Sequence, residues 1–208
     1  MPEQFTSQIQ AKQSAVLQRH GMIPQDGGII SPLDVNYFYF TPEWHIRDGQ
    51  NGLITADNFN DLYTNPRARL LSVGAGPALL EETLVDLGIQ PQQIHVADLD
   101  LTHTPSTFSN RYEFDMWQPW PQLSTKFDVI IFPESASSLS IFPFQDRVGK
   151  MIQLALQATS VLTDDGEIRM NGVQLIEEQA EEISQALSQT GIQFAYNPSG
   201  LVIITRIQ

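Results

Sequence analysis

The chain has 208 residues, enough for one domain with a full hydrophobic core and short for two. Hydrophobic residues make up 41% and charged residues 17%, which is typical of a globular protein and excludes a disordered one. The formal net charge of -13 repels phosphate backbones, so nucleic acid is not expected as a partner.

The sequence also lacks the features of several kinds of site and of a membrane or secreted location. The chain has no cysteine, which excludes disulfides, thiolate metal sites and cysteine nucleophiles. The four histidines are scattered without metal-ligand spacing, so we expect no metal site. No apolar run has the length of a membrane helix, and the first residues lack the basic start and apolar stretch of a signal peptide. We therefore expect a cytoplasmic protein without a membrane partner.

The first 65 residues are predicted to form an extension ahead of the main domain. Apolar residues recur at helical spacing between positions 3 and 20, and Gly21 is suited to end that helix. Positions 23–61 are rich in glycine, proline, asparagine and aromatic residues, as in loops that carry specificity on a rigid scaffold. We expect the helix to bury one face on the main domain.

A strand, a tight turn and a helix are predicted over residues 69–82. The apolar run ends at Gly74 and Gly76, and glycine allows a steep reversal and a close approach of the backbone to a ligand. Pro77 suits the first helical position, because its missing N–H would be unpaired there anyway. The amides of such a helix start favour an anionic or polar ligand group. An ordinary turn between strand and helix would contain the same glycines, so both interpretations stay open at this point.

A second strand, predicted over residues 93–100, ends in acidic residues. Asp98 follows the glycines by about twenty residues, where a carboxylate accepts hydrogen bonds from the hydroxyls of a ribose. The glycines and Asp98 therefore predict one nucleotide-binding site. A dinucleotide motif needs a third small residue where this chain has Leu79, so the pattern disfavours NAD.

Strands and helices are predicted to alternate through the rest of the chain. The elements follow in this order: a short strand at 111–117, a buried strand at 126–132, a helix at 146–162, a turn at 163–166, a strand at 167–171, a helix at 175–190, and a hairpin of 192–196 with 201–207. Alternation of this kind predicts a largely parallel sheet covered by helices.

The glycine turn resembles the first motif of the class I S-adenosylmethionine-dependent methyltransferases, which is similar to Gly-x-Gly-x-Gly and often has proline after the second glycine. Here it stands as Gly74-Ala75-Gly76-Pro77-Ala78. The terminal hairpin is the second point of resemblance. The resemblance implies a Rossmann-like, doubly wound α/β fold: a mixed seven-stranded sheet with a terminal antiparallel hairpin and helices on both faces. It covers residues 66–208, the S-adenosylmethionine-binding domain, and leaves 1–65 as an extension of a helix and substrate-side loops.

The same resemblance implies which residues contact the cofactor. Asp115 would bond the adenine amino group, and Met116 and Trp117 would offer the ring a flat apolar contact. A turn or cap role for Asp115 is equally open. The implied cofactor-binding residues are Ser72, Gly74, Ala75, Gly76, Pro77, Asp98, Leu99, Asp115, Met116 and Pro133.

The residues that leave the strand at 126–132, positions 133–139, would border the transferred methyl group. Members that methylate nucleic-acid bases or glutamine usually have Asn/Asp-Pro-Pro-Tyr there, and Phe132-Pro133-Glu134-Ser135 departs from it, which argues against base methylation. Glu134 and His45 are the catalytic candidates, with His103 as a further possible base. The acceptor pocket would take Tyr37, Tyr39 and Trp44 from the extension, although ordinary burial of these aromatic rings is an equal alternative.

The predicted function is transfer of a methyl group from S-adenosyl-L-methionine to a small-molecule acceptor. One alternative is a binding or scaffold protein that keeps the fold without turnover, because the motif has Ala78 and the family's lysine and proline before the fifth strand are absent. A nicotinamide-dependent oxidoreductase is the other, disfavoured by Leu79 and by the lack of a Tyr-x-x-x-Lys pair. The oligomeric state is not predicted.

Overall fold

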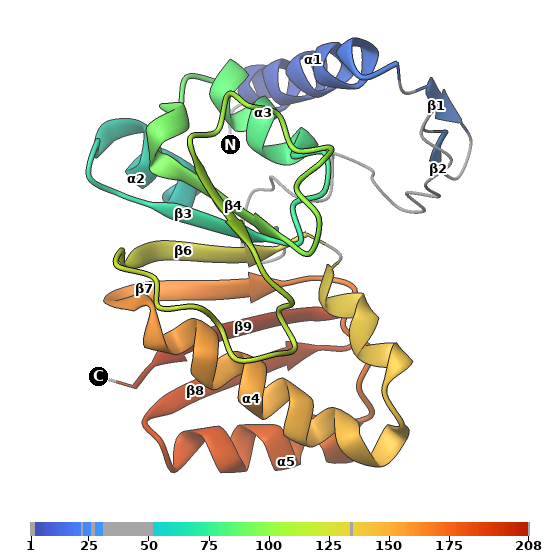
Figure 1. Ribbon diagram of the computed structural model, residues 1–208, viewed down its shortest axis with the longest axis vertical. Helices are drawn as coiled ribbons and strands as arrows, with labels where there is room; N and C mark the ends of the chain where they lie inside the picture. Colours follow the sequence, from blue (N-terminus) through green and yellow to red (C-terminus); the bar gives the residue numbers. More distant parts are fainter. Residues whose placement is uncertain (1–2, 22, 26–27, 31–51, 134, 208) are drawn as a thin grey trace.

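A seven-stranded sheet forms the centre of the computed structural model, which describes residues 3–21, 23–25, 28–30, 52–133 and 135–207 (Figure 1). The strand order is β5-β4-β3-β6-β7-β9-β8. Five strands are parallel: β3 (Leu70–Val73), β4 (Ile94–Asp98), β5 (Asn110–Glu113), β6 (Phe127–Phe132) and β7 (Leu162–Met170). The terminal pair β8 (Ile192–Asn197) and β9 (Leu201–Arg206) is antiparallel, and β9 runs antiparallel to β7.

Helices and two short strands complete the described elements. The helices are α1 (Glu3–Arg19), α2 (Ala56–Thr64), α3 (Leu79–Asp86), α4 (Arg147–Ser160) and α5 (Glu177–Ser188). Single 3-10 turns or short 3-10 helices occur at η2 (Pro91–Gln93), η3 (Ser135–Ile141) and η4 (Phe144–Asp146). A separate two-stranded sheet pairs β1 (Ile23–Gln25) with β2 (Gly28–Ile30).

Hydrophobic cores lie on both faces of the seven-stranded sheet, because consecutive strand residues point to opposite faces. Leu70 packs in the cluster that contains residues of α2 and α3, whereas Leu71 packs in the cluster that contains residues of α4 and α5. All four residues of β3 and all of β6 except Asp128 are buried. The predicted fold, a mixed seven-stranded sheet with helices on both faces and a terminal hairpin, is confirmed.

Part of the predicted extension packs directly on the sheet. Leu53, Ile54 and two residues of α2 belong to the same hydrophobic cluster as Leu70. On β7 the guanidinium of Arg169, which is fully buried, donates to the Gly52 carbonyl at 2.7 Å and to Glu167 at 3.0 Å. The division between residues 65 and 66 stays a prediction.

The helix α1 packs on α3, the helix that follows the glycine turn (Figure 1). Val16 and Leu17 form a small cluster with Leu79. Arg19 donates to Asp86 at 2.8 Å, and a His20 ring nitrogen lies 2.9 Å from a carboxylate oxygen of Glu82. The Arg19–Asp86 pair is exposed, and such pairs contribute little, so the apolar contact supplies most of the attachment.

The start of α3 differs from the prediction. Pro77 is not the first helical residue: the helix begins at Leu79, and Ala78 precedes it with φ 56° and ψ 39°. Gly74 and Gly76 also have positive φ, 74° and 54°. The turn therefore needs three left-handed residues before the helix begins, and an alanine takes the third position at a steric cost of roughly 1 kcal/mol.

Two further boundaries differ. The predicted turn at 163–166 lies inside β7, because β7 advances from Leu162 to Glu167 while its partner β6 advances only from Phe127 to Val129. The extra residues form a bulge in a continuous strand. The strand β5 ends at Glu113, so Asp115 lies in the following loop.

Within the described ranges, no helix is long and apolar enough to cross a membrane, and no three His, Cys, Asp or Glu side chains gather as metal ligands.

His95 should make the stability of the fold sensitive to acid. Its ring is 4% exposed, lies 2.9 Å from the Tyr112 hydroxyl and packs edge-on against Phe127. Burial, with a smaller effect of the Arg69 charge, lowers the pKa of His95 to about 4. Below about pH 6.5 the unfolded chain binds a proton that the folded chain does not, so folding stability falls as the pH falls.

We expect the loss from His95 to be about 2 kcal/mol between pH 7.5 and pH 5. Urea unfolding of the wild type and of His95→Gln at both pH values measures it. The wild type should lose about 2 kcal/mol more than the variant on acidification. Equal losses would show that His95 does not titrate differently in the folded state.

Candidate cofactor site

The glycine turn leaves β3 at the point where the strand order reverses, since β4 lies on one side of β3 and β6 on the other. Ligands of open α/β sheets bind at this point, outside the carboxyl ends of the strands. The amides of Gly74 and Ala75 both donate to the Ala97 carbonyl of β4, at 2.7 and 3.2 Å. The turn is thus attached to the neighbouring strand before it enters α3.

Asp98, at the end of β4, contacts the glycine turn directly. Its Oδ2 accepts the Gly76 N–H at 2.7 Å, and Oδ1 accepts the Asp100 N–H at 3.3 Å. The carboxylate is partly buried and lies 22 positions along the chain from the glycine that it binds. The two features that predicted one site in the sequence therefore meet in space.

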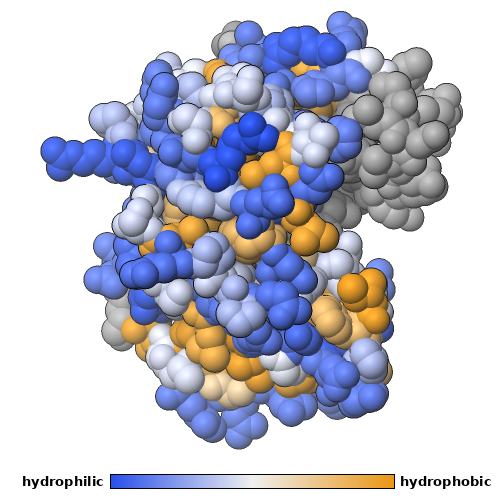
Figure 2. All heavy atoms as spheres, in the orientation of Figure 1, coloured by the Kyte–Doolittle hydropathy of each residue, from blue (hydrophilic) through white to orange (hydrophobic). Residues whose placement is uncertain are grey.

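A cavity of about 660 Å³ opens at the carboxyl ends of these strands. Six of the predicted cofactor-binding residues line it: Gly74, Gly76, Asp98, Leu99, Asp115 and Met116. Hydrophobic atoms are exposed among the polar ones on the face drawn in Figure 2. Two of the most exposed large hydrophobic residues, Leu99 and Ile141, belong to the cavity wall. The rest of the apolar lining consists of Val73, Phe114, Met116 and Trp117, and the η3 segment adds the hydroxyl groups of Ser135 and Ser138.

Four predicted residues do not line the cavity. Ser72, Ala75 and Pro77 are buried, and Pro133 is only partly exposed outside the cavity wall. Ser72 is instead a buried residue of β3 near Glu81 of α3, which is 1% exposed.

Asp115 has the turn role that the sequence left open, and its contact with adenine stays a prediction. Its Oδ1 accepts the main-chain N–H of Trp117 at 2.9 Å, which fixes the loop after β5, and the residue also lines the cavity. Phe114, Met116 and Trp117 present apolar groups beside it. Aromatic and thioether side chains of this kind suit a flat heteroaromatic ring.

The candidate bases are divided between described and undescribed parts of the chain. His103 is exposed and lines the cavity. Glu134 and His45 lie outside the described residues, as do the acceptor-pocket candidates Tyr37, Tyr39 and Trp44.

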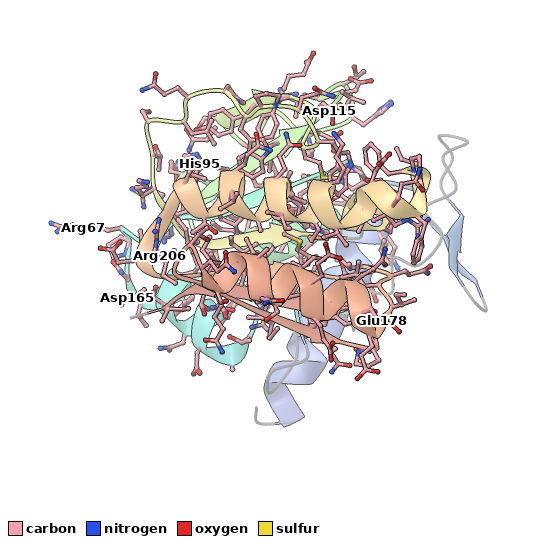
Figure 3. All side chains as sticks on the ribbon, turned by 90° about the horizontal axis from the view of Figure 1, so that it is seen from below. Arg67, His95, Asp115, Asp165, Glu178 and Arg206 are labelled. Carbon is pink, nitrogen blue, oxygen red and sulfur yellow. The ribbon has the colours of Figure 1, made fainter. Side chains whose placement is uncertain are left out.

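The described cavity wall is acidic. It contains Asp98, Asp100 and Asp115 and, among the described residues, neither lysine nor arginine. A hydrogen bond from the Thr102 hydroxyl lowers the pKa of Asp100, so this carboxylate is charged at neutral pH. In Figure 3 the labelled Arg67 and Arg206 lie at one end of the molecule, away from Asp115. The cavity therefore favours neutral or cationic ligand groups.

Glu81 should make the stability of the fold fall as the pH rises from weakly acidic to neutral. Burial raises the pKa of Glu81 to about 7, although the nearby Ser72 hydroxyl opposes this. Between about pH 4.5 and pH 7 the folded chain holds a proton that the unfolded chain has lost, so folding stability falls as the pH rises.

We expect the wild type to lose about 2.5 kcal/mol more than Glu81→Gln between pH 5 and pH 8 in urea unfolding. The amide keeps the shape of the neutral acid and has no proton to lose. The pH dependence from Glu81 has the opposite sign to that from His95. Each contribution is therefore measured as the difference in free energy of unfolding between variant and wild type. A constant difference across the range would contradict a raised pKa for Glu81.

Comparison with known proteins gives a match in structure only. No protein-family model matches the chain, and no curated protein sequence matches it. The S-adenosylmethionine-bound structure of CalS10, an amino pentose methyltransferase from Micromonospora echinaspora, aligns with a TM-score of 0.53 at 15% identity, over 73% of this chain and 89% of CalS10. DesVI from Streptomyces venezuelae aligns with a TM-score of 0.52 at 13% identity, over 73% of this chain and 89% of DesVI. The chain therefore has the fold of the class I S-adenosylmethionine-dependent methyltransferases.

Proposed function

We propose that this protein is an S-adenosylmethionine-dependent methyltransferase. The observation that carries the proposal is the cavity at the switch point, which the glycine turn, Asp98 and Asp115 line together. Its volume of about 660 Å³ is in the range of ligand pockets, about 300–1,000 Å³. The bond from Gly76 leaves acceptor capacity on the Asp98 carboxylate, because each oxygen has two lone pairs. The residues present thus fit a ligand with a ribose and a flat base.

The chain's own residues would bind and orient the reactants. Asp98 would accept the ribose hydroxyls, and Asp115 with Met116 would hold the adenine. S-adenosylmethionine supplies the reactive methyl group on its sulfonium. The protein contributes mainly by aligning the acceptor for in-line attack and by keeping water out, which the apolar side chains of Trp117 and Ile141 favour.

We infer that the acceptor is a small molecule that is neutral or carries an amine. The acidic wall disfavours phosphate or carboxylate groups near the site. CalS10, which shares the fold, is described as an amino pentose methyltransferase, and this supports an acceptor of that size and charge. For a hydroxyl acceptor a base would help, and His103, Glu134 and His45 remain the candidates. The absence of a nucleic-acid partner and the cytoplasmic location remain predictions.

Isothermal titration of the purified protein with S-adenosylhomocysteine, and with NADH as the comparison ligand, tests the proposal. We expect micromolar affinity for S-adenosylhomocysteine and none for NADH. Tight binding of NADH alone would favour the oxidoreductase. Binding of neither would favour the scaffold protein, and binding of the homocysteine compound without product from any amine or hydroxyl acceptor would favour a fold kept without turnover.

A further inference from the structure

The strand order determines how a nucleoside with an amino-acid tail must lie in the cavity. Asp115 and Met116 follow β5, and Asp98 ends β4, so the base and the ribose are placed over these two strands. The next two strands in the sheet are β3 and β6. The amino-acid end of the proposed cofactor therefore lies over Gly74 and the segment that follows β6. This step rests on the proposed function.

Ser135, the first residue of η3, lies directly on the first glycine of the turn. A Cβ atom built on Gly74 would be 2.2 Å from the Ser135 Cβ and 2.6 Å from its Oγ. The Ser135 hydroxyl donates to the Val73 carbonyl at 2.6 Å. The side chain of Ser135 thus occupies the junction of β3 and the turn, on the wall of the cavity.

Ser138 holds Ser135 in this position. Its hydroxyl donates to the Ser135 carbonyl at 2.7 Å and accepts the indole N–H of Trp117 at 2.9 Å. One hydroxyl group therefore joins the segment after β6 to the loop after β5. Both of its partners line the cavity, as does Ser138 itself.

Trp117 has supports that do not involve Ser138. Its main-chain N–H donates to Asp115 Oδ1 at 2.9 Å, and its ring packs edge-on against Phe142, with centroids 5.3 Å apart. The ring is buried, at 6% exposure. The adenine side of the cavity can therefore keep its shape without the Ser138 hydroxyl, whereas the η3 side loses its link to it.

We propose that Ser138 is a positioning residue that fixes η3 so that Ser135 borders the amino-acid end of the cofactor. Removal of its hydroxyl leaves the Ser135 carbonyl and the Trp117 indole N–H without this partner, and η3 is then held mainly by the Ser135 hydroxyl bond to Val73 and by its buried apolar side chains. The wall beside the amino-acid end is then less firmly fixed. The base and ribose contacts of Asp115 and Asp98 are unchanged, so the effect depends on which part of the ligand is present.

Titration of the full chain with S-adenosylhomocysteine and with adenosine tests this role. We expect Ser138→Ala to weaken the binding of S-adenosylhomocysteine about fivefold to tenfold, the range of one or two neutral hydrogen bonds. The affinity for adenosine should change less than twofold. Ser138→Thr keeps the hydroxyl and should restore the affinity. Ser140→Ala alters an exposed serine of η3 outside the cavity wall and should leave both ligands at wild-type affinity.

A double-mutant cycle extends the test to the indole. Trp117→Phe removes only the indole bond to Ser138, so it should weaken the binding of S-adenosylhomocysteine no more than Ser138→Ala does. The double variant should be little weaker than Ser138→Ala alone, because the bond lost in Trp117→Phe is one of the two bonds lost in Ser138→Ala.

Equal weakening of both ligands by Ser138→Ala would mean a general structural defect and would overturn the positioning role, as would no weakening at all. If the wild type binds adenosine but not S-adenosylhomocysteine, or neither ligand, the proposed function fails first and the role of Ser138 falls with it. The wild-type titration thus separates the two failures.

Discussion

Replacing Gly74 by alanine is expected to lower the free energy of unfolding by about 3 kcal/mol and to abolish measurable binding of S-adenosylhomocysteine. Gly74 has φ +74°, a conformation that costs an alanine about 1 kcal/mol. The added Cβ would also lie 2.2 Å from the Ser135 Cβ, and overpacking of this kind costs a further 1–3 kcal/mol, roughly. Either the turn or η3 must move, and both line the cavity. Urea unfolding and ligand titration measure the two effects.

The chain contains a matched control in Gly149, an exposed position inside α4. A Cβ there would meet no atom within 4 Å. Gly149→Ala should therefore raise the free energy of unfolding by about 0.5–1 kcal/mol and leave ligand binding unchanged, because alanine is the better helix former. If Gly74→Ala behaved like Gly149→Ala, the close contact between Gly74 and Ser135 would be contradicted.

Asp98→Ala is expected to weaken the binding of S-adenosylhomocysteine at least 100-fold. The carboxylate is placed to accept the ribose hydroxyls, and a hydrogen bond to a charged group contributes about 1.5–3 kcal/mol. The substitution also removes the acceptor of the Gly76 N–H, which holds the turn against β4. Calorimetric titration of variant and wild type gives the ratio of affinities.

Two further carboxylate variants separate charge from position. Asp98→Asn keeps an acceptor for the Gly76 amide and should lose less affinity than Asp98→Ala. Glu113, opposite Asp98 in the pairing of β4 with β5, is exposed and outside the cavity wall, so Glu113→Ala should bind as the wild type does. An Asp98→Ala variant with wild-type affinity would rule out the ribose assignment.

The fold could be predicted because its main signals are local. The run of apolar residues at 127–132 predicts a buried strand wherever it packs, and turn residues with two β-rich runs predict the terminal hairpin. The start of α3 could not be predicted in the same way. Ala78 takes a left-handed conformation that alanine rarely adopts, so nothing in its identity shows that the turn continues past Pro77. The bulge in β7 could not be predicted either, because Asp-Asp-Gly is typical of a turn.

Only some of the residues that line the cavity could be predicted in the same way. The glycines, Asp98 and Asp115 are residue types whose place at a strand end suggests a ligand, and these residues do line the cavity. Phe114 and Ile141 were missed because an apolar residue in a sequence usually indicates the core, whereas Ile141 is 73% exposed here. The link from Trp117 through Ser138 to Ser135 depends on two loops meeting across strands β5 and β6, which no spacing in the sequence records.

The buried guanidinium of Arg169 has a practical consequence for dissecting this protein. Cutting the chain at residue 65 would remove the Gly52 carbonyl that accepts from Arg169 and would strip four apolar side chains from the sheet: Leu53, Ile54, Phe59 and Leu62. A fragment of 66–208 would thus have a partly uncovered sheet face and a buried charge short of one acceptor, and it should aggregate on expression. The smallest piece worth expressing begins before Gly52.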